Sequence, residues 1–202
     1  NEVFGEALGY ALHTQNPPDY HLERQLAVPG GGSADGAIGR FGTGRAPHPV
    51  AVIELKDART DLDRDRFNGR TPVDQCWDYL NAMPDCPWGI VSNLVELRLY
   101  HRDKTKLRFE RFLLQELRDA RRFREFYALL NRDAFIPSRL RTVSRAEELL
   151  RETDERQREV GDDLYEAYSN NRLALIHHLH RKHDRPVDEA VRISQKIIDR
   201  II

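Results

Sequence analysis

The spacing of apolar residues predicts the elements of the first part of the chain. Five apolar residues recur at helical spacing from Val3 to Ala11 and predict a helix over residues 2–14, ended by the prolines that follow Asn16. Apolar and polar residues then alternate as they do in strands, with glycine-rich turns between the segments. Three strands are expected there, over residues 20–28, 34–41 and 49–56.

A second helix is expected to begin at residues 71–74, Thr-Pro-Val-Asp, and to reach about Ala82. Thr71 suits the N-cap, Pro72 the first helical position and Asp74 the first turn. Residues 57–71 before it are polar, and we interpret them as a mobile loop. Three further strands are expected over residues 88–92, 95–100 and 107–114.

From about residue 119 the pattern becomes helical. Aromatic and leucine residues from Phe123 to Leu130 predict one helix, and Ser144 with Glu147 forms a capping box that opens another. Residues 159–183 and 187–202 are also expected to be helical. We therefore place a soft boundary near residues 118–135. The expected fold class is α/β over residues 1–118, with a mixed sheet flanked by helices, followed by an all-α connector over residues 119–202.

Both ends of the sequence suggest a part of a longer protein. There is no initiator Met, and the last predicted helix reaches Ile201-Ile202 with no glycine, asparagine or proline to close it. An apolar helix end of this kind would expose hydrophobic surface to water. We expect the helix to continue in a longer parent protein.

Composition narrows the class of protein. Hydrophobic residues make up 40% of the chain, charged residues 32%, and the net charge is −1. This is typical of a folded, soluble chain without a global basic field, so any affinity for nucleic acid must come from a local patch. Cys76 and Cys86 form no CxxC pair, and no long apolar run or secretory signal is visible. A cytoplasmic protein that does not cross a membrane is expected.

The second and third predicted strands carry the candidate chemistry. Asp35 and Glu54 would face each other in an antiparallel hairpin if its turn centred near residues 44–45. Glu54 and Lys56 are two residues apart on one strand, so both point to the same face. Two adjacent carboxylates favour a cation between them, and Mg²⁺ prefers such oxygen ligands. A lysine beside them can orient an attacking water, which suits phosphodiester hydrolysis. The alternative is an ordinary surface Glu–Lys pair.

Ala34-Asp35, followed by Glu54-Leu55-Lys56 after an apolar run, resembles the PD-(D/E)xK nuclease pattern, with Ala34 where the pattern has proline. Gln75 and Tyr79 match the QxxxY helix motif of one branch of these nucleases. The ordered set of segments is similar to the N-terminal endonuclease region of type IIG restriction–modification enzymes, with kinship to the nuclease domains of type I restriction subunits. Those segments are residues 71–75, 88–93 and 96–100. Residues 193–202 resemble the connector helix that leads into the methyltransferase of such fused enzymes.

The resemblance implies roles for individual residues. Asp35 and Glu54 would bind Mg²⁺, with Mn²⁺ as a substitute, and Lys56 would be the catalytic lysine. Gln75 and Tyr79 would line the site, contacting DNA backbone or water, although a helix-packing pair is the alternative. Relatives often add an acid from the first helix. Glu2 or Glu6 could serve, and Glu2 is preferred as a third metal ligand.

The function expected from these features is Mg²⁺-dependent cleavage of double-stranded DNA, as the endonuclease part of a restriction–modification enzyme. The methyltransferase and target-recognition domains are not found in these 202 residues, so sequence specificity should be absent. Two alternatives stay open: a repair or junction nuclease with the same core, and a non-catalytic scaffold that binds DNA or protein.

Three other clusters are interpreted as solvated surface or loop rather than as sites. The histidines between His177 and His183 lack a carboxylate or cysteine pattern that would complete a metal site. The arginines between Arg121 and Arg132 could contact phosphates, but nearby acids favour a solvated helix. The Gly30-Gly31-Gly32 turn lacks the following lysine of a phosphate-binding loop.

Overall fold

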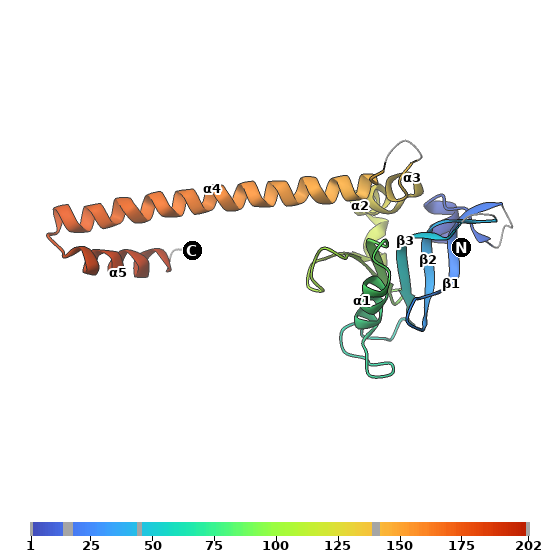
Figure 1. Cartoon of the computed structure of the whole chain (residues 1–202). Helices are drawn as coiled ribbons and strands as arrows, with labels where there is room; N and C mark the ends of the chain where they lie inside the picture. Colours follow the sequence, from blue (N-terminus) through green and yellow to red (C-terminus); the bar gives the residue numbers. More distant parts are fainter. Residues whose placement is uncertain (1, 14–17, 44–45, 139–141, 201–202) are drawn as a thin grey trace. The chain divides into compact units, whose positions relative to one another are not determined.

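The computed structural model of this chain describes residues 2–13, 18–43, 46–138 and 142–200 (Figure 1). It divides into two compact units, Asn1–Glu147 and Glu148–Ile202. The first unit is an α/β fold around a six-stranded mixed sheet, which agrees with the expected fold class. The second is helical.

The sheet places its strands side by side in chain order. The strands are β1 (Asp19–Ala27), β2 (Ser33–Gly42), β3 (His48–Leu55), β4 (Trp88–Ser92), β5 (Glu96–His101) and β6 (Phe109–Leu113). All neighbouring pairs are antiparallel except β3 and β4, which run parallel. Each of the six lies within two residues of a predicted strand.

The parallel pair follows from the helix between its strands. A parallel neighbour requires a crossover connection, and α1 (Pro72–Ala82) supplies it between β3 and β4. The crossover brings the carboxyl ends of β3 and β4 to the same edge, where Leu55 pairs with Ser92. In open α/β sheets, ligand sites occur at this kind of edge.

The predicted start of α1 is confirmed. The Thr71 hydroxyl accepts a hydrogen bond from the Asp74 amide at 3.1 Å, and the Asp74 carboxylate accepts one from the Thr71 amide at 3.3 Å. This reciprocal capping box satisfies two backbone donors at the helix start. Pro72 at the first position donates no hydrogen bond and needs none.

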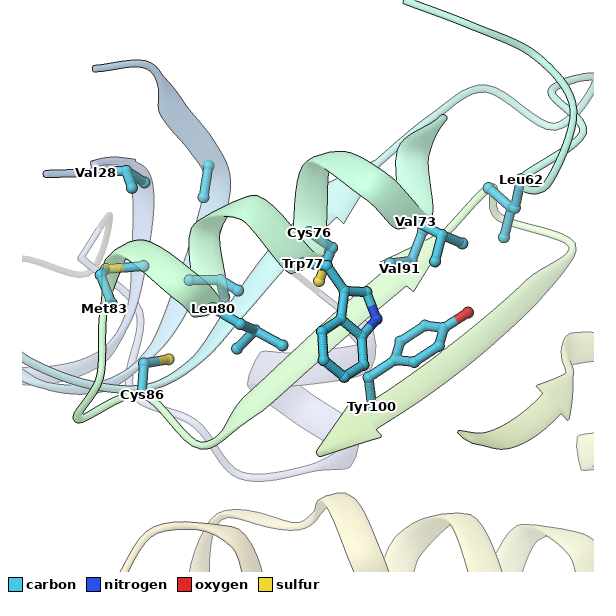
Figure 2. Packing of buried hydrophobic residues seen from close by; sticks show 12 residues of the cluster. Val28, Leu62, Val73, Cys76, Trp77, Leu80, Met83, Cys86, Val91 and Tyr100 are labelled. Carbon is cyan, nitrogen blue, oxygen red and sulfur yellow. The ribbon is translucent and has the colours of Figure 1, made fainter. Parts of the chain in front are cut away.

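One face of α1 packs on the sheet and forms a hydrophobic core with β3, β4 and β5 (Figure 2). Cys76 and Leu80 are fully buried, and the Trp77 ring meets Tyr100 edge-on at 6.2 Å. The helix comes so close to β4 that a Cβ on Gly89 would lie 2.5 Å from the Cys76 sulfur. Glycine at this position therefore sets how near α1 can lie to the sheet.

Helices after the sheet also belong to the first unit. They are η3 (Leu114–Arg118), α2 (Ala120–Leu130) and α3 (Arg132–Phe135). Phe126 packs edge-on against Phe112 of β6 at 5.3 Å, and Phe135 lies 5.6 Å from Trp88 of β4. These contacts pack α2 and α3 on strands of the sheet and make them part of the first unit. The unit accordingly ends at Glu147, later than the boundary expected after residue 118.

The prediction of a regular helix over residues 2–14 is wrong. A short π-helix, η1, covers Glu2–Ala7 only. Gly9 follows with φ 77°, a left-handed conformation that ends the helix. Leu12 then forms a bridge with Leu22 of β1, and the Ala11 carbonyl accepts the Leu22 amide at 3.2 Å. Pairing with the sheet edge replaces the helical hydrogen bonds that the apolar spacing predicted. The prolines expected to end the helix fall partly on residues 14–17, outside the described part.

Residues 57–71 were expected to form a mobile loop, but they pack on the sheet. Leu62 is 1% exposed in the core beneath α1. The Thr60 carbonyl accepts a hydrogen bond from the Asn93 side chain at 2.9 Å, and Asp63 pairs with Arg98 of β5. These three contacts fix residues 57–71 on the sheet, although most residues of this segment are polar.

The second unit comprises α4 (Arg145–Lys182) from Glu148 onward and α5 (Val187–Ile198). The Ser144–Glu147 capping box that opens α4 is confirmed by reciprocal hydrogen bonds of 3.0 and 3.2 Å. Helix α4 is continuous where two helices were expected. It contains Gly161, and a single glycine weakens a helix without necessarily breaking it. Gln195 of α5 donates to the Tyr168 hydroxyl of α4 at 2.9 Å.

Helix α5 is shorter than expected. It ends at Ile198 with Asp199 as C-cap, and residues 201–202 lie outside the described part. Ala190, Ser194 and Ile198 form its buried face at a spacing of four. None of the helices in the described ranges is both long and apolar enough to span a bilayer.

Candidate functional site

Next to Asp35 and Glu54, the register of the β2–β3 hairpin is the one that the sequence predicted, and it shifts by one residue between Ile38 and Gly39. Gly36 pairs with Ile53, and Ala37 with Val52. The next positions along the same register are Asp35 and Glu54. Directly opposed residues of an antiparallel pair carry their side chains on the same face, so the two carboxylates lie side by side. The expected turn at residues 44–45 falls outside the described residues.

Asp35 lies at the exposed edge of this pair. One of its carboxylate oxygens, Oδ2, accepts a hydrogen bond from the Leu55 backbone amide at 2.8 Å. This bond crosses from β2 to the last residue of β3 and fixes the carboxyl group next to Glu54. Asp35 therefore has a defined position although its side chain is exposed to solvent.

Glu54 is the buried acid of the site. It ends the apolar run of β3 and is only 3% exposed. Burial raises the pKa of its carboxyl group above the ordinary value, and the nearby charge of Asp35 raises it further, while Lys56 and Tyr79 act in the opposite direction. A buried carboxylate of this kind requires a cationic partner.

Lys56 supplies that positive charge. Its Nζ lies 2.5 Å from Glu54 Oε1, and its side chain is 17% exposed. Its backbone amide donates to the Ser92 carbonyl of β4 at 2.8 Å, so the residue continues the β3–β4 pairing. The ammonium also lies over the Phe67 ring, 4.9 Å from the centroid. Lys56 is thus oriented toward the same face as Glu54, as expected.

Tyr79 borders the two carboxylates. Its hydroxyl donates to the Ser33 carbonyl at the start of β2, at 3.0 Å. Burial, together with the charges of Glu54 and Asp35, raises the pKa of Tyr79 to about 12. The tyrosine hence keeps its proton and remains a hydrogen-bond donor at neutral pH.

Gln75 lies beside the loop that borders Lys56. Its amide nitrogen donates to the Phe67 carbonyl at 3.4 Å, which links α1 to the loop of residues 57–71. Its side-chain oxygen is buried and has no hydrogen-bond partner within the described part of the chain. Gln75 therefore contacts the site through the loop that lies over Lys56.

The position of the proposed third acid is described for one of its two candidates. The side chain of Glu2, the preferred candidate, lies outside the described part of the structure. Glu6, its alternative, is exposed on η1. Among the side chains that are described, no group of three or more histidine, cysteine, aspartate or glutamate residues is arranged to hold a metal ion.

Asp35 and Glu54 nevertheless fit a divalent cation as two of its ligands. Mg²⁺ commonly uses one or two protein carboxylates and keeps several waters. Two adjacent carboxylates, one of them with a raised pKa, are a donor set that a cation stabilises. Lys56 neutralises only one of the two negative charges.

Sequence reasoning missed Phe67. The residue is 39% exposed, yet its ring lies over Lys56 and its carbonyl accepts from Gln75. The available signal was Asn68-Gly69, a dipeptide that favours a tight two-residue turn. Both residues have positive φ, 53° and 82°, and Phe67 and Arg70 exchange backbone hydrogen bonds across the turn.

The clusters interpreted as surface have local partners. The rings of His178 and His183 are 5.2 Å apart, and His180 Nδ1 lies 2.8 Å from the Arg185 carbonyl. Arg121 and Arg122 both pair with Glu125 on α2. These contacts account for both groups as helix surface.

Comparisons of this chain with models of protein families, with curated proteins and with solved structures give no match.

Proposed function

We propose that this chain is a divalent-metal-dependent endonuclease that hydrolyses phosphodiester bonds of double-stranded DNA. One observation carries the proposal: two carboxylates of paired strands, Asp35 and Glu54, adjoin a lysine ammonium 2.5 Å from the buried one. A structural ion pair needs one acid and one base. The additional acid next to Glu54 raises the energy of the unliganded site, and this is expected where a cation binds.

Asp35 and Glu54 would hold Mg²⁺ or Mn²⁺. When bound, the cation supplies positive charge next to the scissile phosphate and acidifies a coordinated water. The bond from the Leu55 amide leaves one Asp35 oxygen engaged and orients the other. Such preorganisation lowers the reorganisation that accompanies the reaction.

Lys56 would act on the attacking water and on the charge that develops at phosphorus. In hydrolysis the water oxygen bonds to phosphorus, one P–O ester bond breaks, and the leaving oxygen gains a proton. The Lys56 ammonium can donate hydrogen bonds to the water or to a phosphate oxygen. Its contact with Glu54 keeps it at the site before substrate binds.

DNA contacts are proposed for the loop that borders the site. Arg59, Arg64 and Arg66 are exposed on residues 57–71, and such side chains bind phosphates without reading sequence. The net charge of −1 makes this local group, rather than the whole surface, the source of affinity.

The setting that we propose is restriction of foreign DNA by a fused cleavage–methylation enzyme. Support comes from the resemblance of residues 34–35, 54–56 and 75–79 to PD-(D/E)xK nucleases, and from a mixed sheet compatible with a restriction-endonuclease-like core. In this proposal the helices of the second unit would act as a connector toward methyltransferase and target-recognition domains.

The test is incubation of the purified chain with supercoiled plasmid and Mg²⁺ or Mn²⁺, with a chelator as control. Nicking or linearisation is expected only with metal. Asp35→Ala and Glu54→Ala should abolish cleavage and weaken Mn²⁺ binding measured by calorimetry. Lys56→Ala should abolish turnover and retain most of the Mn²⁺ binding.

Other results favour other functions. Cleavage by Glu54→Ala at the wild-type rate means that the site is misassigned. DNA binding without cleavage and without Mn²⁺ binding points to a scaffold. Preference for branched over linear duplex points to a junction nuclease.

A further inference from the structure

The Lys56 ammonium contacts two partners of different chemistry. Glu54 Oε1 is 2.5 Å from Nζ, and the Phe67 ring centroid is 4.9 Å from it. A lysine side chain has four rotatable bonds and loses much rotamer freedom when it is fixed. A single ion pair leaves the ammonium free to turn about the carboxylate, whereas the aromatic face limits it to one side.

Phe67 is itself held by backbone contacts on both sides. Its amide donates to the Arg70 carbonyl at 2.8 Å and its carbonyl accepts the Arg70 amide at 3.2 Å, around the turn formed by Asn68 and Gly69. The same carbonyl accepts from Gln75 of α1. These bonds fix the position of the ring, although 39% of the residue is exposed.

The loop that carries Phe67 is fixed to the sheet as well. Asp63 forms two hydrogen bonds with Arg98 of β5, and the Thr60 carbonyl binds Asn93 next to the end of β4. Lys56, at the start of the loop, is joined to Ser92 of β4. The loop segments that carry Lys56 and Phe67 are hence both hydrogen-bonded to neighbouring strands of the sheet.

We infer that Phe67 is a positioning residue that holds the Lys56 ammonium against Glu54 by a cation–π contact. The inference rests on the proposed function for its effect on catalysis: Lys56 must lie at one place for the attacking water to be oriented. A misplaced group near the reacting atoms lowers turnover more than substrate binding.

The experiment uses the full chain with Phe67→Leu and Phe67→Tyr. Leucine keeps an apolar side chain of similar reach and removes the π face, and tyrosine retains that face. Phe123→Leu is the matched control, because Phe123 is 40% exposed and lies on α2. Thermal unfolding of all variants checks that each is folded.

The first readout is independent of DNA cleavage. The chain has five lysines, so the ε-methylene signals of ¹³C-labelled lysine are few, and a Lys56→Arg variant assigns the one of Lys56. Protons above an aromatic ring are shifted upfield by its ring current. The upfield shift should be present in wild type and Phe67→Tyr, and lost in Phe67→Leu alone. An unchanged Lys56 signal in Phe67→Leu overturns the inference.

The second readout is steady-state cleavage of a short duplex. Phe67→Leu should lower kcat about tenfold with a smaller change in KM, and Phe67→Tyr should restore kcat. Equal kcat for Phe67→Leu and wild type overturns the positioning role. Absence of metal-dependent cleavage by the wild-type chain refutes the proposed function instead, and the lysine spectrum then still decides whether Phe67 holds Lys56.

Discussion

The guanidinium of Arg98 binds both carboxylate oxygens of Asp63, Nη1 to Oδ1 at 2.8 Å and Nη2 to Oδ2 at 2.9 Å. Arg98 comes from the buried surface of β5, and Asp63 comes from the loop that follows the candidate site. Arg98 also binds Glu96 at 2.8 Å and lies over the Phe109 ring. The pair therefore holds the loop of residues 57–71 against strand β5.

Breaking this pair is expected to destabilise the first unit. Asp63→Ala should lower the free energy of unfolding by about 1 kcal/mol, a modest value because the Asp63 side chain is 61% exposed. Arg98→Ala should cost about 3 kcal/mol, since it leaves Glu96 without its cation and removes buried packing. Urea unfolding measures both values. Arg64→Ala, an exposed arginine of the same loop, is the control; a cost equal to that of Arg98→Ala would contradict the argument.

The capping box of α1 makes stability depend on pH in the acid range. The hydrogen bond from Lys106, helped by Thr71, lowers the pKa of Asp74 to about 2, below its unfolded value of about 3.9. A depressed carboxyl pKa contributes stability that is present above the unfolded value and is lost as pH falls toward the folded one. Unfolding free energy should therefore drop between about pH 4 and about pH 2. Asp74→Asn should flatten this part of the curve, and an unchanged slope would refute the assignment.

Glu54→Gln separates a catalytic carboxylate from a structural one. Cleavage should be lost, while stability at neutral pH should rise slightly. The gain is expected because burial raises the pKa of Glu54, so that its ionised form opposes folding above that pKa. Below the ordinary carboxyl pKa both states are protonated and the gain should vanish. A lower melting temperature at neutral pH would identify Glu54–Lys56 as a stabilising ion pair.

DNA affinity is expected to be weak, independent of sequence and steeply dependent on salt. A few arginines of residues 57–71 would contact phosphates, and each contact releases counterions. Fluorescence anisotropy with two unrelated duplexes should give similar Kd values that rise together as salt increases. Replacing Arg59 and Arg66 by alanine should reduce the slope of log Kd against log salt. Tight binding to only one of the duplexes would show that a recognition element is present.

Local sequence signals predicted the hairpin register, the α1 cap and all six strands, because each depends on neighbours in the chain. The glycine-containing turn signal between residues 41 and 46 was sufficient to predict that Asp35 and Glu54 face each other. The same reasoning failed at residues 2–14, where Leu12 pairs with Leu22 of the sheet edge. The conformation of that segment depends on its contact with a strand that is distant in sequence. The spacing of apolar residues does not predict such contacts.

The rest of the candidate site could not be predicted from the sequence for the same reason. Residues 57–71 look polar, yet Leu62 enters the core and Asp63 meets Arg98, 35 positions away. The resemblance implied that Gln75 lines the site, but it did not predict the hydrogen bond from Gln75 to the Phe67 carbonyl. Asn68-Gly69 signals a turn after Phe67, but only the folded loop brings the Phe67 ring to Lys56.

The close approach of α1 to Gly89 limits which sequences can carry this site. Any larger side chain at position 89 would meet the Cys76 sulfur and Leu80, both of which are buried between α1 and the sheet. The helix would then lift from the sheet and take Tyr79 and Gln75 with it. A directed-evolution library with alanine or serine at position 89 should thus lose activity as often as one mutated at the carboxylates. The distance between α1 and β4 would thus determine which substitutions are tolerated at position 89, although glycine has no functional group.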